Sequence, residues 1–127
     1  MSISFYPASG LVIVRADIEG PLGQAVLRLA VDSGSTFTTV DSQILASVGA
    51  IPEPSASILR MSTANSIFSA QRVSISRFAA LGKELWDYSV ISIPIQADVQ
   101  IDGLLDLDFF RNHKLTIDFN NGTIELT

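Results

Sequence analysis

Short runs of aliphatic and β-branched residues, interrupted by glycine, proline and small polar residues, dominate the chain and predict β-strands. The segments with this composition are 11–18, 25–31, 37–40, 57–62, 67–78 and 85–93. Gly20-Pro21-Leu22-Gly23 separates the first two segments and predicts a turn. The link 63–66 is small and polar, so we expect the two segments on either side of it to form a hairpin.

The clearest alternation of apolar and polar residues lies near the C-terminus. Leu115, Ile117 and Phe119 alternate with polar residues, and 123–126 follows after Asn121-Gly122. Asn-Gly is typical of a two-residue type I′ turn, because both central residues of that turn need a positive φ. We therefore expect the chain to close with a tight β-hairpin.

Two short helices are predicted where an aspartate precedes an apolar segment. Asp41 is placed as the N-cap of a helix over 42–48, and Gly49 is placed to end it. Asp106 is placed in the same way before a helix over 107–113. The pattern as a whole predicts an all-β protein, a barrel or a sandwich, with two short helices.

The composition narrows the possible functions. The chain has 127 residues, which favours a single domain over 1–127. It carries 8 basic and 13 acidic side chains, giving a net charge of −5, and this balance argues against nucleic acid as a partner. Because the chain has no cysteine, disulfides, thiolate metal sites and a cysteine nucleophile are excluded.

The low charge content also bears on partners and location. Charged residues make up 17% of the chain, which hints that some apolar surface is covered by a partner. The start of the chain lacks the basic and apolar regions of a signal peptide, and aliphatic runs such as 11–14 are too short to cross a bilayer. We therefore expect a cytoplasmic protein with no membrane partner.

One segment carries the main candidate for chemistry, Asp32-Ser33-Gly34-Ser35. An apolar strand leads directly into Asp32, and an aspartate at the end of a buried strand is costly unless it is satisfied or used. Gly34 permits backbone geometry that a Cβ would block, and the two serine hydroxyls are placed to donate hydrogen bonds to the carboxylate. Such a string is also an ordinary turn composition, so these four residues alone do not establish a function.

A second motif, Gly103-Leu104-Leu105, lies near the C-terminus. Together with the Asp-Ser-Gly turn, it resembles the retropepsin-like aspartic proteases, the single-domain relatives of pepsin. In that family an Asp-Thr/Ser-Gly turn precedes a hydrophobic-hydrophobic-Gly segment, and small bacterial members commonly read Gly-Leu-Leu-Gly-x-Asp-Phe-Leu. The resemblance covers most of the chain, from about Leu11 to Leu126. The matching residues of the second region are Gly103, Leu104, Leu105, Asp108, Phe109, Leu115, Thr116, Ile117 and Asp118.

The resemblance implies a closed, acid-protease-like barrel in which Asp32 is the catalytic aspartate. It implies that Ser33 locks two catalytic turns together across a dimer, and that Ser35 hydrogen-bonds the catalytic carboxylate. Gly34 belongs to the same turn, and the segment 104–106 (Leu104, Leu105 and Asp106) is expected to pack beside it. The hairpin expected to close over a bound peptide, the flap, comprises Met61, Ser62, Thr63, Ala64, Asn65, Ser66 and Ile67.

Aspartic proteolysis predicts a homodimer. The reaction needs two carboxylates, one acting as a base on water and the other as an acid toward the scissile carbonyl. The chain contains only one Asp-Ser/Thr-Gly turn, so a symmetric second copy supplies the second Asp32. The expected substrate is an extended peptide or protein, with no cofactor and no metal. The pockets of the protein that receive the substrate's side chains are expected to include Ile91, Ile93, Leu104 and Leu105.

Two departures from the family pattern leave alternatives open. Asp106 stands where the family usually has glycine, and it either caps the following helix or alters the acidity of the catalytic carboxylates. Asn65-Ser66 stands where the flap often has glycine, although asparagine tolerates left-handed geometry. These departures motivate a second hypothesis, a catalytically impaired, protease-like dimer that binds peptides without cleaving them.

Other candidate sites carry less weight. Asp98, Asp102, Asp106 and Asp108 form an acidic run that is conceivable as a calcium or magnesium site, but the EF-hand spacing is absent. His113 is expected at a surface position near a helix end rather than in catalysis.

Overall fold

The computed structural model describes residues 2–8, 10–52, 58–62, 67–96 and 98–127, and for 58–62 and 67–69 it describes the backbone only. The strands are β1 (Ser2–Ser4), β2 (Ile13–Gly20), β3 (Gly23–Val31), β4 (Thr39–Asp41), β5 (Ile58–Ser62), β6 (Ile67–Ala80), β7 (Lys83–Ile93), β8 (Gly103–Leu105), β9 (Leu115–Asp118) and β10 (Thr123–Leu126). The helices are α1 (Ser42–Ser47) and α2 (Leu107–Phe110). Strands β1 and β8 have no counterpart among the predicted strands.

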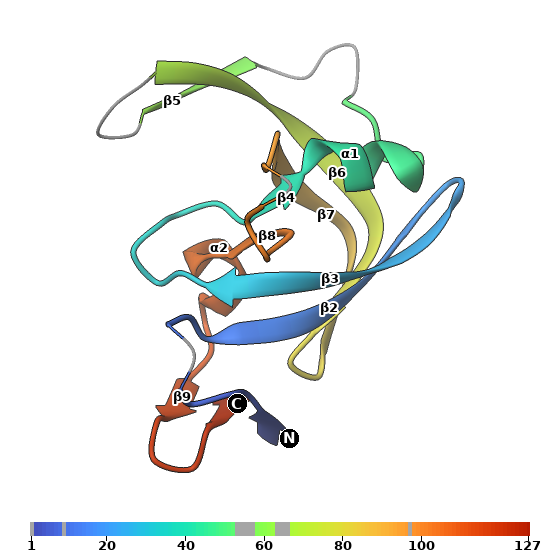
Figure 1. Cartoon of the computed structure of the whole chain (residues 1–127). Coiled ribbons are helices and arrows are strands. Elements are labelled where there is room, and N and C mark those ends of the chain that lie inside the picture. The colour runs from blue at the N-terminus through green and yellow to red at the C-terminus, as the bar shows by residue number, and fades with distance from the viewer. Residues whose placement is uncertain (1, 9, 53–57, 63–66, 97) are drawn as a thin grey trace.

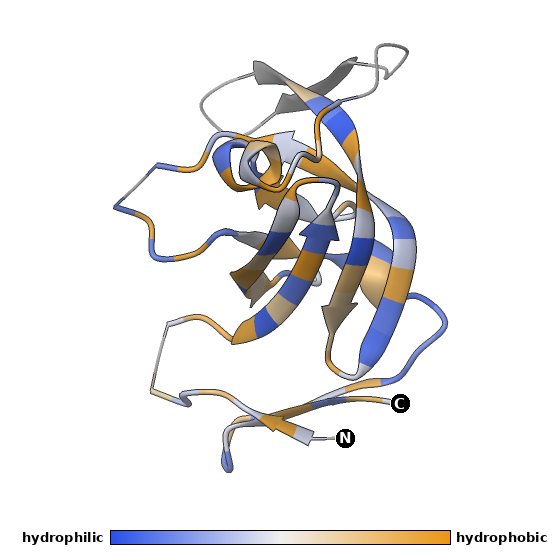
Figure 2. Cartoon of the chain, turned by 90° about the vertical axis from the view of Figure 1, so that its right-hand side faces the viewer, coloured by the Kyte–Doolittle hydropathy of each residue, from blue (hydrophilic) through white to orange (hydrophobic). Residues whose placement is uncertain are grey.

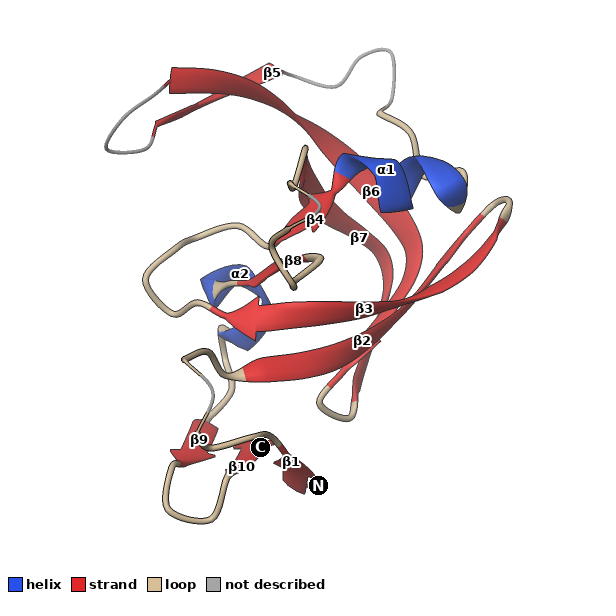
Figure 3. Cartoon of the chain, in the orientation of Figure 1, coloured by secondary structure: helices blue, strands red, loops and turns tan. Residues whose placement is uncertain are grey.

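Six strands close into a barrel (Figure 3). They pair in the order β2-β3-β8-β4-β7-β6, and β6 pairs again with β2. The β3–β8 and β4–β7 pairs are parallel, whereas the other pairs in the ring are antiparallel. β5 pairs with β6 to form the predicted hairpin, which projects beyond the barrel (Figure 1). The prediction of an all-β closed barrel with two short helices is confirmed.

Alternation along the strands builds the core. In β2, Val14, Ala16 and Ile18 are buried inside the barrel, while the charged residues between them face outward. Figure 2 shows the same alternation as hydrophilic and hydrophobic bands along the long strands. β8 escapes sequence prediction because it has three residues, of which Gly103 and Leu105 are both buried, so it shows no polar and apolar alternation over a useful length.

A separate three-stranded sheet, in the order β1-β10-β9, brings the two ends of the chain together (Figure 1). The predicted C-terminal hairpin is confirmed, but the prediction of a two-residue type I′ turn is wrong. Asp118 pairs with Thr123, so four residues form the loop. Of these four, only Gly122 has a positive φ, at 67°, and the Asp118 carboxylate accepts backbone N–H groups of the loop, which favours the longer connection.

The helices follow their predictions to different extents. Asp41 caps α1 as predicted, since its carboxylate accepts the Gln43 N–H, and Gly49 follows with a φ of +79°. The prediction of a helix over 107–113 is wrong in length, because α2 ends at Phe110 and Arg111 adopts an extended conformation. Among the described residues, no helix is long and apolar enough to span a membrane.

Candidate active site

Asp32 immediately follows β3 and is half-buried. Its backbone N–H donates to the Leu105 carbonyl oxygen at 2.9 Å, which continues the parallel pairing of β3 with β8 by one residue. Its carboxylate oxygen Oδ1 accepts the Gly34 N–H at 3.0 Å. The predicted turn therefore forms, with the aspartate at its start, while Ser33 and Gly34 are exposed at its tip.

β8 lies between the two arms of the loop that contains Asp32. It runs parallel to β3 on one side and antiparallel to β4 on the other. A Cβ at Gly103 would overlap the Thr39 carbonyl oxygen, so only glycine permits this close approach. The Leu104-Leu105 segment thus packs beside the Asp32 turn, as the sequence resemblance implies.

The residues after β8 hold the far side of the turn by backbone contacts. The Leu107 N–H donates to the Ser35 carbonyl oxygen at 3.0 Å, and the Asp108 N–H donates to the Thr36 carbonyl oxygen at 3.0 Å. Together with the Asp32–Leu105 bond, these contacts fasten the loop at its start and at its end. The predicted hydrogen bond from the Ser35 hydroxyl to Asp32 stays a prediction.

Thr38 is a buried hydrogen-bonding centre that the sequence analysis did not find. Its hydroxyl donates to Asp108 Oδ1 at 2.7 Å and accepts from the Tyr88 hydroxyl at 3.1 Å and from the Asp106 N–H at 3.2 Å. Asp108 Oδ1 also accepts the Thr38 N–H at 3.1 Å. Burial raises the pKa of Tyr88, as do Asp108 and Asp106, and this outweighs the opposing hydrogen bond with Thr38, so the Tyr88 hydroxyl stays protonated and able to donate. No local pattern in the sequence reveals this centre, because the partners of the Thr38 hydroxyl lie 50 to 70 residues away along the chain.

Aromatic packing fixes α2 against the barrel. The Phe109 ring lies 5.7 Å from the Phe78 ring and 6.3 Å from the Tyr88 ring, measured between centroids. Lys83 Nζ donates to the Phe109 carbonyl oxygen at 2.9 Å, and burial lowers the pKa of this lysine. The segment that supports the Asp32 turn is therefore anchored in the core.

Asp106 does not cap α2 through its side chain. It occupies the N-cap position, but the side chain makes no capping hydrogen bond, and the residue is fully buried. Burial, assisted by the negative charges of Asp32 and Asp108 and opposed by the Ser35 hydroxyl, raises the pKa of Asp106 to about 6. The Ser35 hydroxyl faces the carboxyl, yet neither Asp106 oxygen reaches hydrogen-bond geometry with a described residue. The helix-capping interpretation is therefore wrong.

The remaining predicted site residues are placed in part. Met61, Ser62 and Ile67 lie on the β5–β6 hairpin, in which Ser62 pairs with Ile67. Thr63, Ala64, Asn65 and Ser66 lie outside the described residues. Ile91 and Leu105 are fully buried in the barrel, which contradicts their predicted place in side-chain pockets, whereas Ile93 and Leu104 are half-buried.

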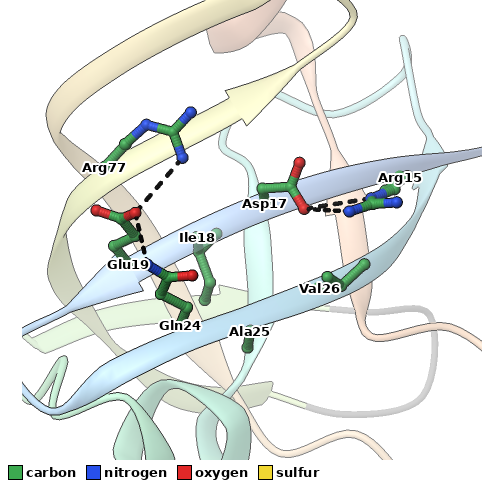
Figure 4. Close-up of a pocket in the computed structure, with 8 residues that line it drawn as sticks. All are labelled: Arg15, Asp17, Ile18, Glu19, Gln24, Ala25, Val26 and Arg77. Atoms are coloured by element: carbon green, nitrogen blue, oxygen red, sulfur yellow. Dashed lines mark hydrogen bonds and ion pairs between the residues drawn. The ribbon is translucent and has the colours of Figure 1, made fainter.

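Two of the surface depressions differ in how they lie relative to the turn. One, on the outer face of the barrel, is lined by paired charges such as Arg15–Asp17 and Arg77–Glu19 (Figure 4). It includes the start of β3, whereas Asp32 follows the other end of that strand. The second includes Ser33 and is lined by the apolar side chains Leu107, Phe110 and Leu115 together with the polar loop residues Arg111, Asn112 and the exposed His113.

The acidic run does not assemble into a metal site. Asp102 Oδ2 accepts the Arg28 N–H at 2.8 Å, and Asp108 is engaged by Thr38. Within the described ranges, no group of three or more histidine, aspartate or glutamate side chains is arranged to hold a metal ion.

Comparisons with known proteins agree with this geometry. The family model described as aspartyl protease matches residues 14–109, which spans β2 to α2. A retropepsin-like aspartic protease from Rickettsia conorii, known from its crystal structure, has a similar fold with a TM-score of 0.66 at 14% identity, over 100% of this chain and 91% of that chain. No curated protein matches the sequence. Since the family model covers most of the chain, including the Asp32 turn and the segment that supports it, the chain belongs to the aspartyl protease family.

Proposed function

We propose that the protein is an aspartic endopeptidase whose active site forms between two copies of the chain, each contributing Asp32. The observation that carries this proposal is the state of the Asp32 carboxylate. It is half-exposed at the end of a core strand, its turn is fixed by backbone contacts, and among the described residues it accepts a hydrogen bond from the Gly34 N–H. Its remaining lone pairs are available for water and substrate.

The chemistry follows from placing two such carboxylates together. Two adjacent like charges repel, so the pair favours the state with one shared proton. The ionised member takes a proton from a water molecule, which attacks the scissile carbonyl carbon, and the protonated member gives its proton to the carbonyl oxygen. The carboxyl that took the proton from water then gives it to the peptide nitrogen, the C–N bond breaks, and the other carboxylate takes back a proton from a hydroxyl of the tetrahedral intermediate, which restores the shared proton.

A homodimer accounts for the second carboxylate. The sequence has one Asp-Ser-Gly turn, so a single chain over 1–127 supplies half of the pair. The depression at Ser33, where Leu107, Phe110 and Leu115 contribute apolar surface, gives a second copy a place to pack next to the turn. In this arrangement the exposed Ser33 hydroxyls of the two copies hold the turns together.

The substrate is an extended polypeptide. We infer that it lies between the Asp32 pair and the β5–β6 hairpins, where a peptide in β-conformation adds backbone hydrogen bonds to exposed strand edges. The half-buried side chains Leu104 and Ile93 are the candidates for lining its pockets.

Cleavage of denatured casein between about pH 3 and pH 8 tests this proposal. We expect Asp32→Asn to abolish cleavage and to leave the dimer intact in analytical ultracentrifugation, because asparagine keeps the size of the side chain but removes its acid–base chemistry. Asp17→Asn is the matched control, since Asp17 pairs with Arg15 on the outer face of the barrel. Cleavage by the Asp32 variant at the wild-type rate would show that the assignment is wrong.

A second candidate function is peptide binding without cleavage. It is favoured by the buried Asp106 carboxyl, which stands beside the Asp32 turn where the family usually has glycine. An intact dimer that binds unfolded casein but yields no products at any pH would support this function over the first.

A further inference from the structure

The Asp106 carboxyl is enclosed by the chain that carries it. It is 0% exposed in a single chain, and neither oxygen has a hydrogen-bond partner among the described residues. Asp108, two residues later, is instead held by the Thr38 N–H and hydroxyl. A buried carboxyl without partners is costly, so its retention at this position calls for a functional explanation.

The neighbours of Asp106 along the chain hold it against the Asp32 turn. Leu105, before it, accepts the Asp32 N–H, and Leu107, after it, donates to the Ser35 carbonyl oxygen. The backbone of Asp106 has φ −111° and ψ −175°, an extended conformation that any residue adopts. Its conformation therefore does not require glycine, and the carboxyl is enclosed behind the turn by contacts on both sides.

The described residues whose charges act on this carboxyl are negative. Burial, then Asp32 and Asp108, raise the pKa of Asp106, and the Ser35 hydroxyl is the group that opposes the rise. Tyr88, on β7, reaches the same region through the Thr38 hydroxyl and stays neutral. Lys83 binds the Phe109 carbonyl oxygen, and the charge that acts on it is that of Asp108.

We propose that Asp106 is a positioning residue that forms a coupled carboxyl pair with Asp32 of the same chain, so that the charge on one controls the protonation of the other. This proposal rests on the proposed function for its catalytic consequence, but the pairing itself does not require activity. In the dimer it places a second acidic group behind each Asp32. Adding negative charge there makes the shared catalytic proton harder to remove, so the working range extends to higher pH.

Direct titration of Asp106 tests the pairing without any activity assay. We expect the carboxyl carbon of Asp106, followed by nuclear magnetic resonance, to titrate at least about half a pH unit lower in Asp32→Asn than in the wild type, because a neighbouring negative charge is removed. Asp17→Asn, which removes a remote carboxylate, is expected to leave this titration unchanged. Equal titration of Asp106 in all three proteins would overturn the proposal.

The pH profile of kcat/KM tests the catalytic consequence. We expect Asp106→Asn and Asp106→Gly to move the loss of activity on the alkaline side to lower pH by at least about half a unit, since both variants lack the second carboxyl. A merely structural role would lower the rate at all pH values without moving the profile, and that result would overturn the proposal. A shifted Asp106 titration with no cleavage by any variant would support the pairing and refute the proposed function.

Discussion

Two loops of this protein begin with an aspartate and contain a glycine, yet they use the carboxylate differently. In the C-terminal loop, Asp118 accepts the Asn120 N–H at 2.9 Å, the Asn121 N–H at 3.0 Å and the Asn121 side-chain amide at 2.8 Å. In the loop after β3, Asp32 accepts the Gly34 N–H at 3.0 Å from its own turn. The Asp118 carboxylate is thus occupied by its own loop, while Asp32 keeps capacity for other partners.

The difference lies in what stabilises each loop. The Asp118 loop is organised by its own side chain, which leaves little for chemistry. The Asp32 loop is held from outside, by the backbone of Leu105, Leu107 and Asp108. External support leaves a carboxylate both rigid and available, which is what a catalytic group needs. We therefore expect that disrupting the contacts that hold the Asp32 loop lowers catalytic activity. Disrupting the Asp118 loop is expected to lower stability and to leave activity unchanged.

The largest effect is expected from Thr38→Val, which keeps the side-chain shape but removes the hydroxyl that holds the supporting segment at Asp106 and Asp108. The Thr38 hydroxyl makes three buried hydrogen bonds, so their loss is expected to lower the free energy of unfolding by about 3 kcal/mol. A displaced turn is expected to lower kcat/KM on casein by about 100-fold. Urea unfolding and initial rates measure the two effects.

Thr38→Ser is the matched control, because it keeps the hydroxyl and removes only the methyl group. We expect it to retain most of the activity and to cost about 1 kcal/mol of stability. If the serine and valine variants lost activity equally, the hydroxyl would have no part in holding the Asp32 turn.

The next effect concerns Asp106 and depends on pH. Its folded-state pKa of about 6 lies above the ordinary value of 3.8, so the folded state binds more protons between these values and stability falls as pH rises through this window. The full shift corresponds to about 3 kcal/mol, and we expect about 2 kcal/mol because solvent near the half-exposed Asp32 screens the charge. Urea unfolding of Asp106→Asn at fixed protein concentration is therefore expected to show no such fall between pH 4 and pH 7.

The comparison of wild type and variant at pH 4 separates this effect from packing. At that pH Asp106 is largely neutral in the folded state and most of the pH-dependent loss has not yet occurred, so the difference reports mainly the fit of the amide. A wild-type stability that stayed flat from pH 4 to pH 7 would contradict a raised pKa for this carboxyl.

The comparison also explains what the sequence predicts and what it does not. The Asp32 turn, the long strands and the C-terminal hairpin carry local signals, namely glycine, alternation and Asn-Gly, and each is found. Thr38, Tyr88 and β8 act through partners distant in sequence, and no local pattern reveals them. For Asp106 the sequence allowed two interpretations. An N-cap position can be predicted from the local sequence, whereas burial of the carboxyl without a hydrogen-bond partner is decided by packing against distant residues.

A smaller effect is expected at Gly122, where the C-terminal loop meets the start of the chain. Its φ is +67°, and a Cβ there would lie 2.7 Å from both the Phe5 carbonyl oxygen and Pro7 Cγ. Gly122→Ala is expected to cost about 1 to 2 kcal/mol of stability, measured by urea unfolding. Gly10→Ala is the matched control, since a Cβ at Gly10 meets no atom within 4 Å. Equal losses in the two variants would show that the contacts of Gly122 do not matter.

The smallest effect is expected from Asp118→Asn, which tests the other half of the comparison. Hydrogen bonds from the Asn121 backbone and side chain lower the pKa of Asp118, with a further contribution from the Asn120 N–H. The carboxylate therefore stabilises the fold above its ordinary value of 3.8, and this contribution is lost as pH falls below it. In thermal unfolding we expect the variant to have a slightly lower Tm than the wild type at pH 7 and a similar Tm near pH 3. Casein cleavage is expected to be unchanged, since the Asp32 turn does not draw on this loop. A variant that lost cleavage while keeping its Tm would show that the two aspartate loops are not divided between stability and chemistry.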